Sequence, residues 1–208
     1  HELRSPLQTL SAAASVLSRH TEGMNPRAAA AASLVAGEVG RFQALVSDLL
    51  ELARGDQPAS LEPTDVAELA RAVCRARGLP ASKVDIQPGT EVVWPLDRRR
   101  FRQALINLAD NAERHGGGLC CIHIGQSNGV RTVDVDDEGP GVSPPDRHII
   151  FDRFVRGRTA GARGDADGAG LGLALVHQHI TAHGGTITAL TRPGGGARFR
   201  IELPAESS

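Results

Sequence analysis

The sequence predicts an α+β protein in which a helical hairpin precedes an α/β sandwich. In the first 54 residues, apolar side chains recur at alternating steps of three and four, the spacing of helices that pack on one another. After residue 63, short segments of alternating polarity are interspersed with helical periodicities, which is typical of a sheet covered by helices. We therefore expect a helical unit at 1–54, a linker at 55–63 and a second domain at 64–208.

The helical unit is expected to contain two helices. Their apolar positions are Leu3, Leu7, Leu10, Ala14 and Leu17 in the first helix, and Val35, Val39, Phe42, Val46, Leu49 and Ala53 in the second. Residues 20–25 connect them, Asn25 can cap the second helix, and Pro26 suits its first turn. Because one hairpin buries too little apolar surface, we expect two chains to pair as a homodimer with a four-helix bundle.

The elements of the second domain follow from turn residues and local periodicity. Strands are expected at residues 61–66, 84–87, 91–96, 119–125, 130–136, 186–191 and 197–203. Helices are expected at 67–77 and 171–183, with another between them that Asp97 caps. The last two strands form a hairpin around 193–196. These elements give a mixed, mostly antiparallel sheet with helices on one face.

Residues 139–170 form a connection that is too long for an ordinary loop. Within it, residues 157–168 are rich in Gly, Ala, Arg and Asp and nearly lack apolar side chains. Such a segment buries too little surface to offset the entropy lost on ordering. We therefore expect a mobile lid, disordered from about residue 156 to 167 in the absence of a ligand, with Phe151 and Phe154 as its nearest apolar anchors.

Composition excludes several function classes. The net charge of −1 and the aromatic content of 3% argue against a nucleic-acid partner, which would favour a basic surface with stacking rings. No apolar stretch approaches the ~20 residues that span a bilayer. Cys74, Cys120 and Cys121 show no metal-binding spacing and no disulfide framework. We therefore expect this part of the protein to be cytoplasmic.

Segment 101–116 carries two patterns on one expected helix. An inward stripe is formed by Phe101, Leu105, Leu108 and Ala112. A different face carries Asn107, Asn111, Arg114 and His115. Carboxamide oxygens suit Mg²⁺ and a guanidinium suits phosphate, so this face predicts a metal–triphosphate site. Taken alone, an ordinary solvated face explains the pattern equally well.

Two glycine-containing motifs downstream favour the nucleotide interpretation. After the strand expected at 130–136 come Asp137, Gly139 and Gly141, where the Asp can accept a hydrogen bond from an exocyclic amine and the glycines let a flat base approach. Further on, a glycine-rich loop with Gly168, Gly170, Leu171 and Gly172 leads into a helix, which aims backbone N–H groups at phosphate. Each motif alone is weak evidence, but the three in this order predict a nucleotide site.

With these three motifs, the chain resembles the Bergerat-type ATP-binding domain that sensor histidine kinases share with type II topoisomerases, the ninety-kilodalton heat-shock chaperones and the MutL repair proteins. Residues 150–157, Ile-Phe-Asp-Arg-Phe-Val-Arg-Gly, are similar to the phenylalanine box in the ATP lid of histidine kinases. Residues 1–7, His-Glu-Leu-Arg-Ser-Pro-Leu, are similar to the histidine box of that family. The resemblance covers essentially the whole chain, with its boxes in the family's order.

The resemblance implies that the domain binds ATP with Mg²⁺. It implies that Asn111 holds Mg²⁺ on the triphosphate with support from Asn107, and that Asp137 binds the adenine amine. The nucleotide-binding set is completed by Arg114, His115, Gly139, Gly141, Phe154, Gly168, Gly170, Leu171 and Gly172.

The resemblance also makes His1 the phosphoacceptor. Pro6 bends the helix beside it, and Glu2 can take the proton released as His1 attacks the γ-phosphorus. Ser5 stands where the family usually has Thr or Asn, the residue tied to dephosphorylating the regulator, so a phosphatase activity stays open. The phosphoryl group is then expected to pass to an Asp in the receiver domain of a response regulator.

Two other function classes stay open. A hydrolysing ATPase of the topoisomerase or chaperone type shares the nucleotide fold, but those relatives carry a glutamate where this chain has Asn107. A non-catalytic dimerising scaffold has no need of intact nucleotide motifs. We also expect this chain to be a fragment, since family hairpins begin several turns before the histidine. Any sensor or membrane span, and with it any membrane partner, is then expected upstream.

Overall fold

The structure, a computed structural model, describes residues 9–10, 12–13, 15–16, 24–53, 57–155 and 170–205. The chain divides into two units, His1–Ala53 and Arg54–Ser208, and each is described by itself. The segment 1–7 with its expected phosphoacceptor, and the expected lid at 156–167, lie outside the described residues.

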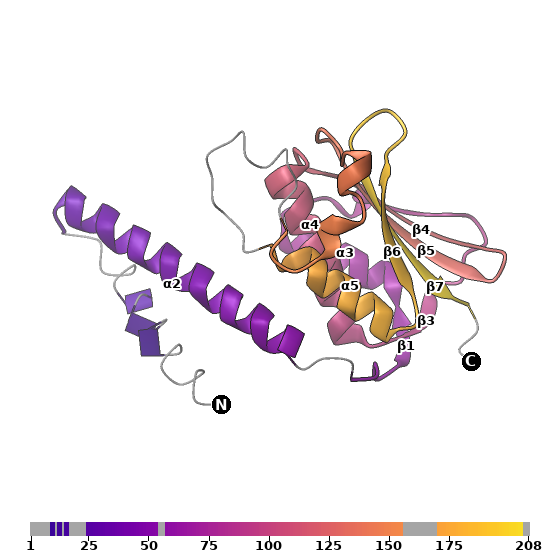
Figure 1. The fold of residues 1–208 in the computed structure, drawn as a ribbon, viewed down its shortest axis with the longest axis horizontal. Helices are drawn as coiled ribbons and strands as arrows, with labels where there is room; N and C mark the ends of the chain where they lie inside the picture. The colour runs from indigo at the N-terminus through magenta and orange to yellow at the C-terminus, as the bar shows by residue number, and fades with distance from the viewer. Residues whose placement is uncertain are drawn as a thin grey trace. The chain divides into compact units, whose positions relative to one another are not determined.

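Helix α2 (Pro26–Ala53) is the main described element of the first unit (Figure 1). The Arg27 backbone N–H donates to Asn25 Oδ1 at 2.9 Å, which confirms the predicted cap. Along the helix, Val35, Phe42 and Leu49 repeat at seven-residue intervals and are exposed. An exposed heptad stripe of this kind is typical of helices that pack against another helix.

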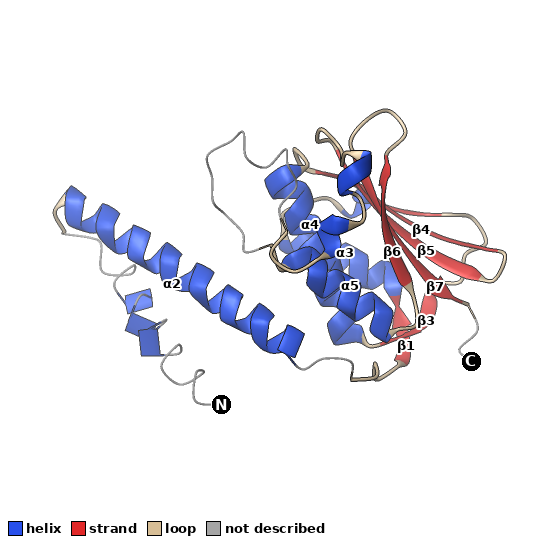
Figure 2. Cartoon of the chain, viewed as in Figure 1, coloured by secondary structure: helices blue, strands red, loops and turns tan. Residues whose placement is uncertain are grey.

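The second unit is built on a five-stranded sheet with the order β2-β4-β5-β7-β6 (Figure 2). Its strands are β2 (Val84–Ile86), β4 (Leu119–Ser127), β5 (Val130–Asp137), β6 (Thr186–Thr191) and β7 (Ala197–Pro204). Strand β2 pairs with β4 in parallel, and the other neighbours are antiparallel. Separately, β1 (Glu62–Asp65) pairs with β3 (Val93–Leu96) in an antiparallel ladder.

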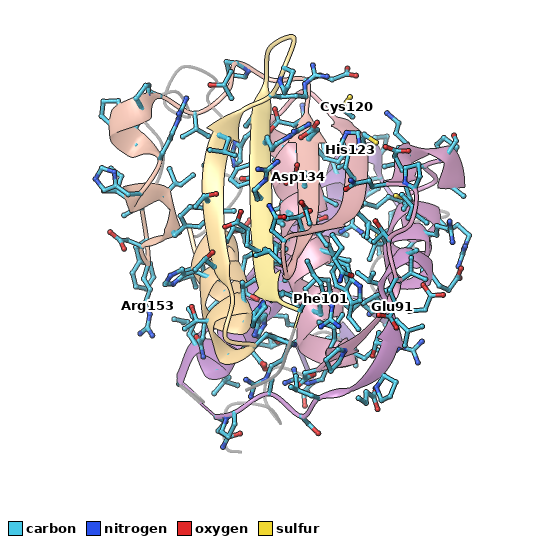
Figure 3. The ribbon with its side chains drawn as sticks, turned by 90° about the vertical axis from the view of Figure 1, so that its right-hand side faces the viewer. Glu91, Phe101, Cys120, His123, Asp134 and Arg153 are labelled. Atoms are coloured by element: carbon cyan, nitrogen blue, oxygen red, sulfur yellow. The ribbon has the colours of Figure 1, made fainter. Side chains whose placement is uncertain are left out.

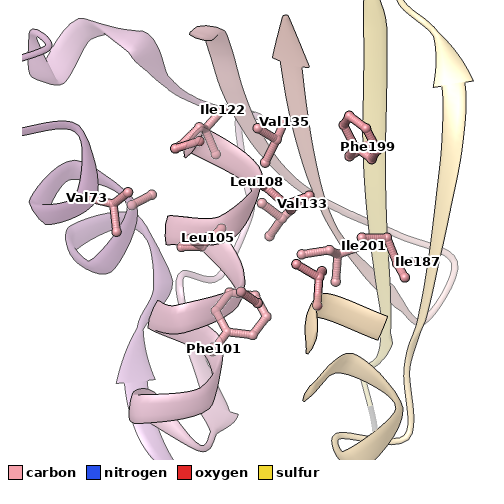
Figure 4. Close-up of a cluster of buried hydrophobic side chains, with 14 of the residues drawn as sticks. Val73, Phe101, Leu105, Leu108, Ile122, Val133, Val135, Ile187, Phe199 and Ile201 are labelled. Atoms are coloured by element: carbon pink, nitrogen blue, oxygen red, sulfur yellow. The ribbon is translucent and has the colours of Figure 1, made fainter. Parts of the chain in front are cut away.

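Three helices cover one face of this sheet: α3 (Val66–Ala76), α4 (Arg98–His115) and α5 (Gly172–Ala182) (Figure 2). The core lies between the layers, where α4 places Phe101, Leu105 and Leu108 against strand residues such as Val133 and Ile201, all fully buried (Figure 4). Burial of such side chains is the largest favourable term in folding, at about 1.5–3 kcal/mol each. The predicted inward stripe of α4 is confirmed.

The observed elements agree closely with those that the sequence predicts. The hairpin of β6 and β7 is present, and the sheet is mixed and mostly antiparallel. Some element ends differ: β3 begins at Val93, and α5 begins at Gly172 and ends at Ala182. The strands expected at 61–66 and 91–96 do not join the main sheet but pair with each other as β1 and β3, and a short 3₁₀ turn, η1 (Ala81–Lys83), was not expected. The long connection after residue 139 contains two short 3₁₀ turns, η2 (Pro144–Asp146) and η3 (Ile149–Phe151), which the sequence analysis missed. None of the described helices is long and apolar enough to cross a membrane.

The sheet face opposite the helices carries a ladder of charged pairs (Figure 3). Arg200 binds both carboxylate oxygens of Asp134 at 2.8 and 2.7 Å, and Arg198 binds both of Asp136 at 2.7 Å. These pairs stand directly opposite one another on β5 and β7. Bidentate geometry of this kind fixes the register of the two strands as well as stabilising them.

The start of α4 is joined to the end of α5 through His183. Asp97 caps α4 by accepting from Arg100 N at 3.0 Å, and the Asp97 backbone N–H donates to His183 Nε2 at 2.9 Å. His183 Nδ1 is 2.6 Å from the carbonyl of His179, so the ring is a neutral tautomer that donates from Nδ1. Burial of the ring is the main cause that lowers the pKa of His183 from its ordinary value of 6.5, and the bond to the His179 carbonyl only partly opposes it.

This lowered pKa predicts a loss of stability on acidification. The unfolded chain binds a proton at His183 near pH 6.5 whereas the folded chain does not, so the free energy of unfolding should fall as the pH drops from 6.5 toward the folded-state pKa. His183→Gln should be less stable at pH 8 but should show a shallower pH dependence. Urea unfolding, followed by the fluorescence of buried Trp94, measures both. His148→Gln, an exposed histidine, is the control, and equal slopes for wild type and His183→Gln would contradict the prediction.

Candidate functional site

The polar face of α4 meets the start of α5 through Asn107. Its Nδ2 donates to the carbonyl of Gly172 at 3.2 Å, and its Oδ1 accepts from Gln103 Nε2 at 3.0 Å. Both ends of the carboxamide are therefore used within the protein. Asn107 ties α4 to the helix that follows the glycine-rich loop, and Gln103 holds it in that orientation.

Asn111 lies one turn further along α4 and is half-buried. No side chain or backbone group in the described part of the chain engages its carboxamide, in contrast to Asn107. Its oxygen is thus available to a ligand beside the junction of α4 and α5.

Arg114 and His115 follow in the last turn of α4 and are exposed. Arg114 Nη2 lies 3.8 Å from Asp110 Oδ2, but Asp110 is held more closely by Arg77, whose Nε is 3.1 Å from Oδ1. A contact of 3.8 Å between an exposed guanidinium and a carboxylate that Arg77 already engages is weak, so Arg114 can turn toward an anion at little energetic cost.

Asp137 ends β5 with a carboxylate that is only 4% exposed. Its Oδ1 accepts from Gly139 N at 3.0 Å and from Ala197 N at 2.8 Å. Its Oδ2 accepts no hydrogen bond within the described residues. A buried carboxylate that is oriented by two backbone donors and keeps an oxygen free is suited to bind an amine.

Glycines allow the close approach of α4 to this carboxylate. A Cβ on Gly116, the residue after α4, would lie 2.5 Å from both Cβ and Cγ of Asp137. A Cβ on Gly139 would lie 2.6 Å from Gly116 Cα. Gly141 has a φ of +78°, which favours glycine. The C-terminal end of α4 and the loop after β5 therefore pack backbone against backbone around Asp137.

The loop before α5 has open backbone donors. Leu171 is buried and precedes the helix but supplies no side-chain cap, whereas Asp65 and Asp97 cap α3 and α4. The first N–H groups of α5 have no intrahelical acceptors, and a helix N-terminus favours an anion. The bond from Asn107 to the Gly172 carbonyl places these donors beside the polar face of α4.

Phe154 and Gly170 meet at the two ends of segment 155–169. The Phe154 backbone N–H donates to the Gly170 carbonyl at 3.0 Å. Both residues have positive φ, +64° for Phe154 and +68° for Gly170. Phe154 is 65% exposed, and a left-handed conformation is rare for so bulky a residue. A strained, exposed aromatic side chain therefore lies where this segment begins.

The structure thus places most of the predicted site residues around one region of the second unit. The ends of α4, β5 and the loop before α5 contribute Asn107, Asn111, Arg114, His115, Asp137, Gly139, Gly141, Gly170, Leu171 and Gly172. His1, Glu2, Ser5 and Gly168 lie outside the described residues. Sequence reasoning missed Gln103 and Gly116. A signal was present for both: Gln103 stands one helical turn before Asn107, so it can bond to it, and Gly116 is the first glycine after the helix, where a close backbone contact is possible.

Comparisons with known proteins show which proteins this chain is similar to. Residues 96–207 match the family "Histidine kinase-, DNA gyrase B-, and HSP90-like ATPase", and residues 1–58 match the "His Kinase A (phospho-acceptor) domain". The chain is 35% identical over its whole length to the signal transduction histidine-protein kinase AfsQ2 of Streptomyces coelicolor, and covers 41% of it. It is 33% identical, again over its whole length, to the sensor protein SphS of Synechococcus elongatus, and covers 54% of it.

A solved structure shows the same fold. The chain aligns over its whole length with 45% of full-length ShkA in complex with AMPPNP, at a TM-score of 0.74 and 28% identity. The chain therefore spans about half, or less, of the length of these relatives.

The packing around Asp137 predicts that Gly116→Ala disturbs the site. The added methyl group must push Asp137 away from its two backbone donors, since no flexible side-chain end can yield at 2.5 Å. We expect a loss of about 1–3 kcal/mol in the free energy of unfolding and weaker binding of adenine nucleotides. Gly40→Ala on α2, where a Cβ meets nothing within 4 Å, is the control. Unchanged affinity in Gly116→Ala, measured with a fluorescent ATP analogue, would contradict this assignment of Asp137.

Proposed function

Because the chain belongs to the histidine kinase-, DNA gyrase B- and HSP90-like ATPase family, and its first 58 residues match the phospho-acceptor domain of histidine kinases, we propose that it phosphorylates its own His1 from ATP. The phosphoryl group then passes to an Asp of a response regulator. One observation carries the proposal: the carboxamide of Asn111, which has no partner among the described residues, the buried carboxylate of Asp137 and the uncapped start of α5 border one region in a chain that also matches an acceptor domain.

ATP binds with its base near Asp137 and its phosphates near α5. Oδ2 of Asp137 accepts a hydrogen bond from the adenine amine, and the backbone at Gly139 and Gly141 borders the ring. The first N–H groups of α5 bind phosphate oxygens. The remaining phosphate contacts come from Arg114, His115, Gly168, Gly170, Leu171 and Gly172, and Phe154 belongs to the lid.

The residues present fit Mg²⁺ that is bound together with nucleotide. Among the described residues, no group of three or more His, Cys, Asp or Glu side chains could hold a metal ion by itself. Mg²⁺ commonly takes one or two protein oxygens and completes its shell with phosphates and waters. The Asn111 oxygen meets this requirement, and the bound ion would neutralise charge on the phosphates. Asn107 supports this arrangement by holding α5 against α4.

The transfer itself requires an imidazole nitrogen of His1 in line with the γ-phosphorus. The nitrogen forms a bond to phosphorus, ADP leaves, and Glu2 accepts the proton of the ring. Most of the rate comes from positioning and charge stabilisation, as in other phosphoryl transfers. Asn107 cannot act as a base for water, because its carboxamide is neutral and donates to Gly172, and this disfavours hydrolysis.

We propose a homodimer as the working form. The exposed stripe of Val35, Phe42 and Leu49 supports it, since a second hairpin would cover these side chains. The receiver domain of the regulator docks on the same hairpin near His1.

Because relatives of this chain are named sensor proteins, we propose that this part works on the cytoplasmic side of a longer, membrane-anchored protein.

His1→Gln should abolish labelling by γ-labelled ATP while leaving nucleotide affinity unchanged, because the acceptor and the ATP site lie in different units. In the wild type, the label should be labile in acid and stable in base, as phosphohistidine is. His20→Gln is the control, since it removes another histidine of the hairpin. Released phosphate without label would indicate an ATPase, and neither product would indicate a scaffold. A label that persists in His1→Gln would show that another residue is the acceptor.

Asn111→Ala should lower the rate of autophosphorylation by about a hundredfold or more, because it removes an oxygen that organises the phosphates. The fold should survive, since Asn111 is half-buried and lies off the core stripe. Arg102→Ala, an exposed residue on the same helix, is the control. Normal labelling by a folded Asn111→Ala protein would rule out this assignment.

A further inference from the structure

The start of α4 holds a segment that lies far away in sequence. Arg100 is only 8% exposed, and its Nη1 donates to the backbone carbonyl of Gln57 at 2.7 Å. Its neighbours Arg98 and Arg99 are exposed. One arginine of this basic run is therefore buried against residues that precede the domain's first strand.

Asp97 makes a second contact to the same segment. Besides capping α4 through Oδ1, it uses Oδ2 to accept from Ser60 N at 3.4 Å, and Arg100 Nε lies 3.4 Å from that oxygen. Although burial opposes it, the hydrogen bonds from Arg100 N and Ser60 N hold the pKa of Asp97 below its ordinary value, so the carboxylate stays charged at neutral pH. The β1–β3 ladder ends at the pair Glu62 and Leu96. The contacts of Asp97 and Arg100 lie just beyond that pair and hold the preceding chain back to residue 57.

A helix cap alone does not require this arrangement. Capping uses only Oδ1 of Asp97, and α3 is capped by Asp65 without any buried arginine. Removing a guanidinium from water is costly unless its hydrogen bonds are met inside the protein. At Arg100, Nη1 donates to the Gln57 carbonyl, and Nε, which makes no hydrogen bond, lies 3.4 Å from the carboxylate of Asp97. The partners of this buried cation therefore come from the contact with residues 57–60 and from Asp97, which takes part in the same contact.

The contact also joins the two parts of the chain that match different domains. Gln57 lies at the end of the segment that matches the phospho-acceptor domain, and Asp97 and Arg100 lie at the start of the segment that matches the ATPase family. Helix α4, which begins at this contact, also carries Asn107 and Asn111. The connection to the hairpin is therefore anchored on the helix that bears the nucleotide site.

We propose that Asp97 and Arg100 form a clamp that fixes residues 57–60 to α4 and makes both residues positioning residues for phosphoryl transfer. This proposal rests on the function proposed above. With the clamp closed, residues 54–56 alone separate α2 from the clamped segment; with it open, the connection extends through residue 61 to β1. Effective concentration falls roughly as the −3/2 power of length, so lengthening from three to eight residues should slow the transfer about fourfold.

Two variants of the 208-residue chain test the clamp from opposite sides. Arg100→Met keeps much of the side-chain volume but removes the donors, and Ser60→Pro removes a backbone N–H without touching α4. Both should lower the autophosphorylation rate about fourfold, leave the affinity for a fluorescent ATP analogue unchanged, and speed amide hydrogen exchange at 57–61. Arg98→Met is the control. Arg100→Lys keeps a cation but has a single donor nitrogen, so it should recover part of the rate. Trp94 fluorescence confirms that each variant is folded.

The outcomes separate this proposal from the proposed function. Faster exchange at 57–61 with an unchanged rate of labelling would overturn the clamp alone. A fall in nucleotide affinity that matches the fall in labelling would also overturn it, because the effect would then act through the ATP site. A wild-type chain that binds ATP but is not labelled would overturn the proposed function, and the clamp with it, since there would be no transfer to position.

Discussion

The burial of one stripe of α4 against the sheet fixes the helix that carries four of the candidate site residues. Phe101, Leu105 and Leu108 are fully buried, so the helix can neither rotate nor slide without exposing them. Its start then meets residues 57–60, Asn107 in its middle bonds to the start of α5, and its end brings Gly116 against Asp137. The hydrophobic core therefore holds α4 in one position, and the helix in turn fixes where its polar side chains lie.

The three helices that cover the sheet, α3, α4 and α5, differ in how their N-terminal ends are capped. Helices α3 and α4 begin with an aspartate whose carboxylate satisfies a backbone donor, and these starts are complete without a ligand. Helix α5 begins after buried Leu171 and has no such cap. An uncapped start costs some stability, but it leaves positive partial charge and N–H groups for an anion. The start of α5 is instead tied to α4 by Asn107, which donates to the Gly172 carbonyl and leaves the first N–H groups of the helix available.

Local patterns predicted most of the fold, because each depends on residues close in sequence. The stripe of α4, the caps at Asn25 and Asp97 and the hairpin of β6 and β7 all belong to this class. The bond from Asn107 to Gly172 and the contact of Gly116 with Asp137 could not be predicted, since they join residues that only the tertiary fold brings together. Sequence reasoning placed Asn107 among the metal-supporting residues, and only the structure shows that its carboxamide holds two helices together. The burial of Arg100 could not be predicted either. Arg98 and Arg99 beside it are exposed, and the residue type is the same at all three positions.

The choice of arginine at position 100 follows from geometry. The guanidinium presents donors in a fixed plane, so one side chain can engage the Gln57 carbonyl through Nη1 while its Nε faces Asp97. A lysine offers a single ammonium on a flexible stem and reaches one of these groups at a time. Because a buried ion pair adds little net stability, its value lies in specifying one arrangement over others. Here the specified arrangement is the path of the chain between Gln57 and β1, which decides where the domain's connection to the hairpin begins. A hydrophobic residue at this position could stabilise the domain equally well and leave that path undefined.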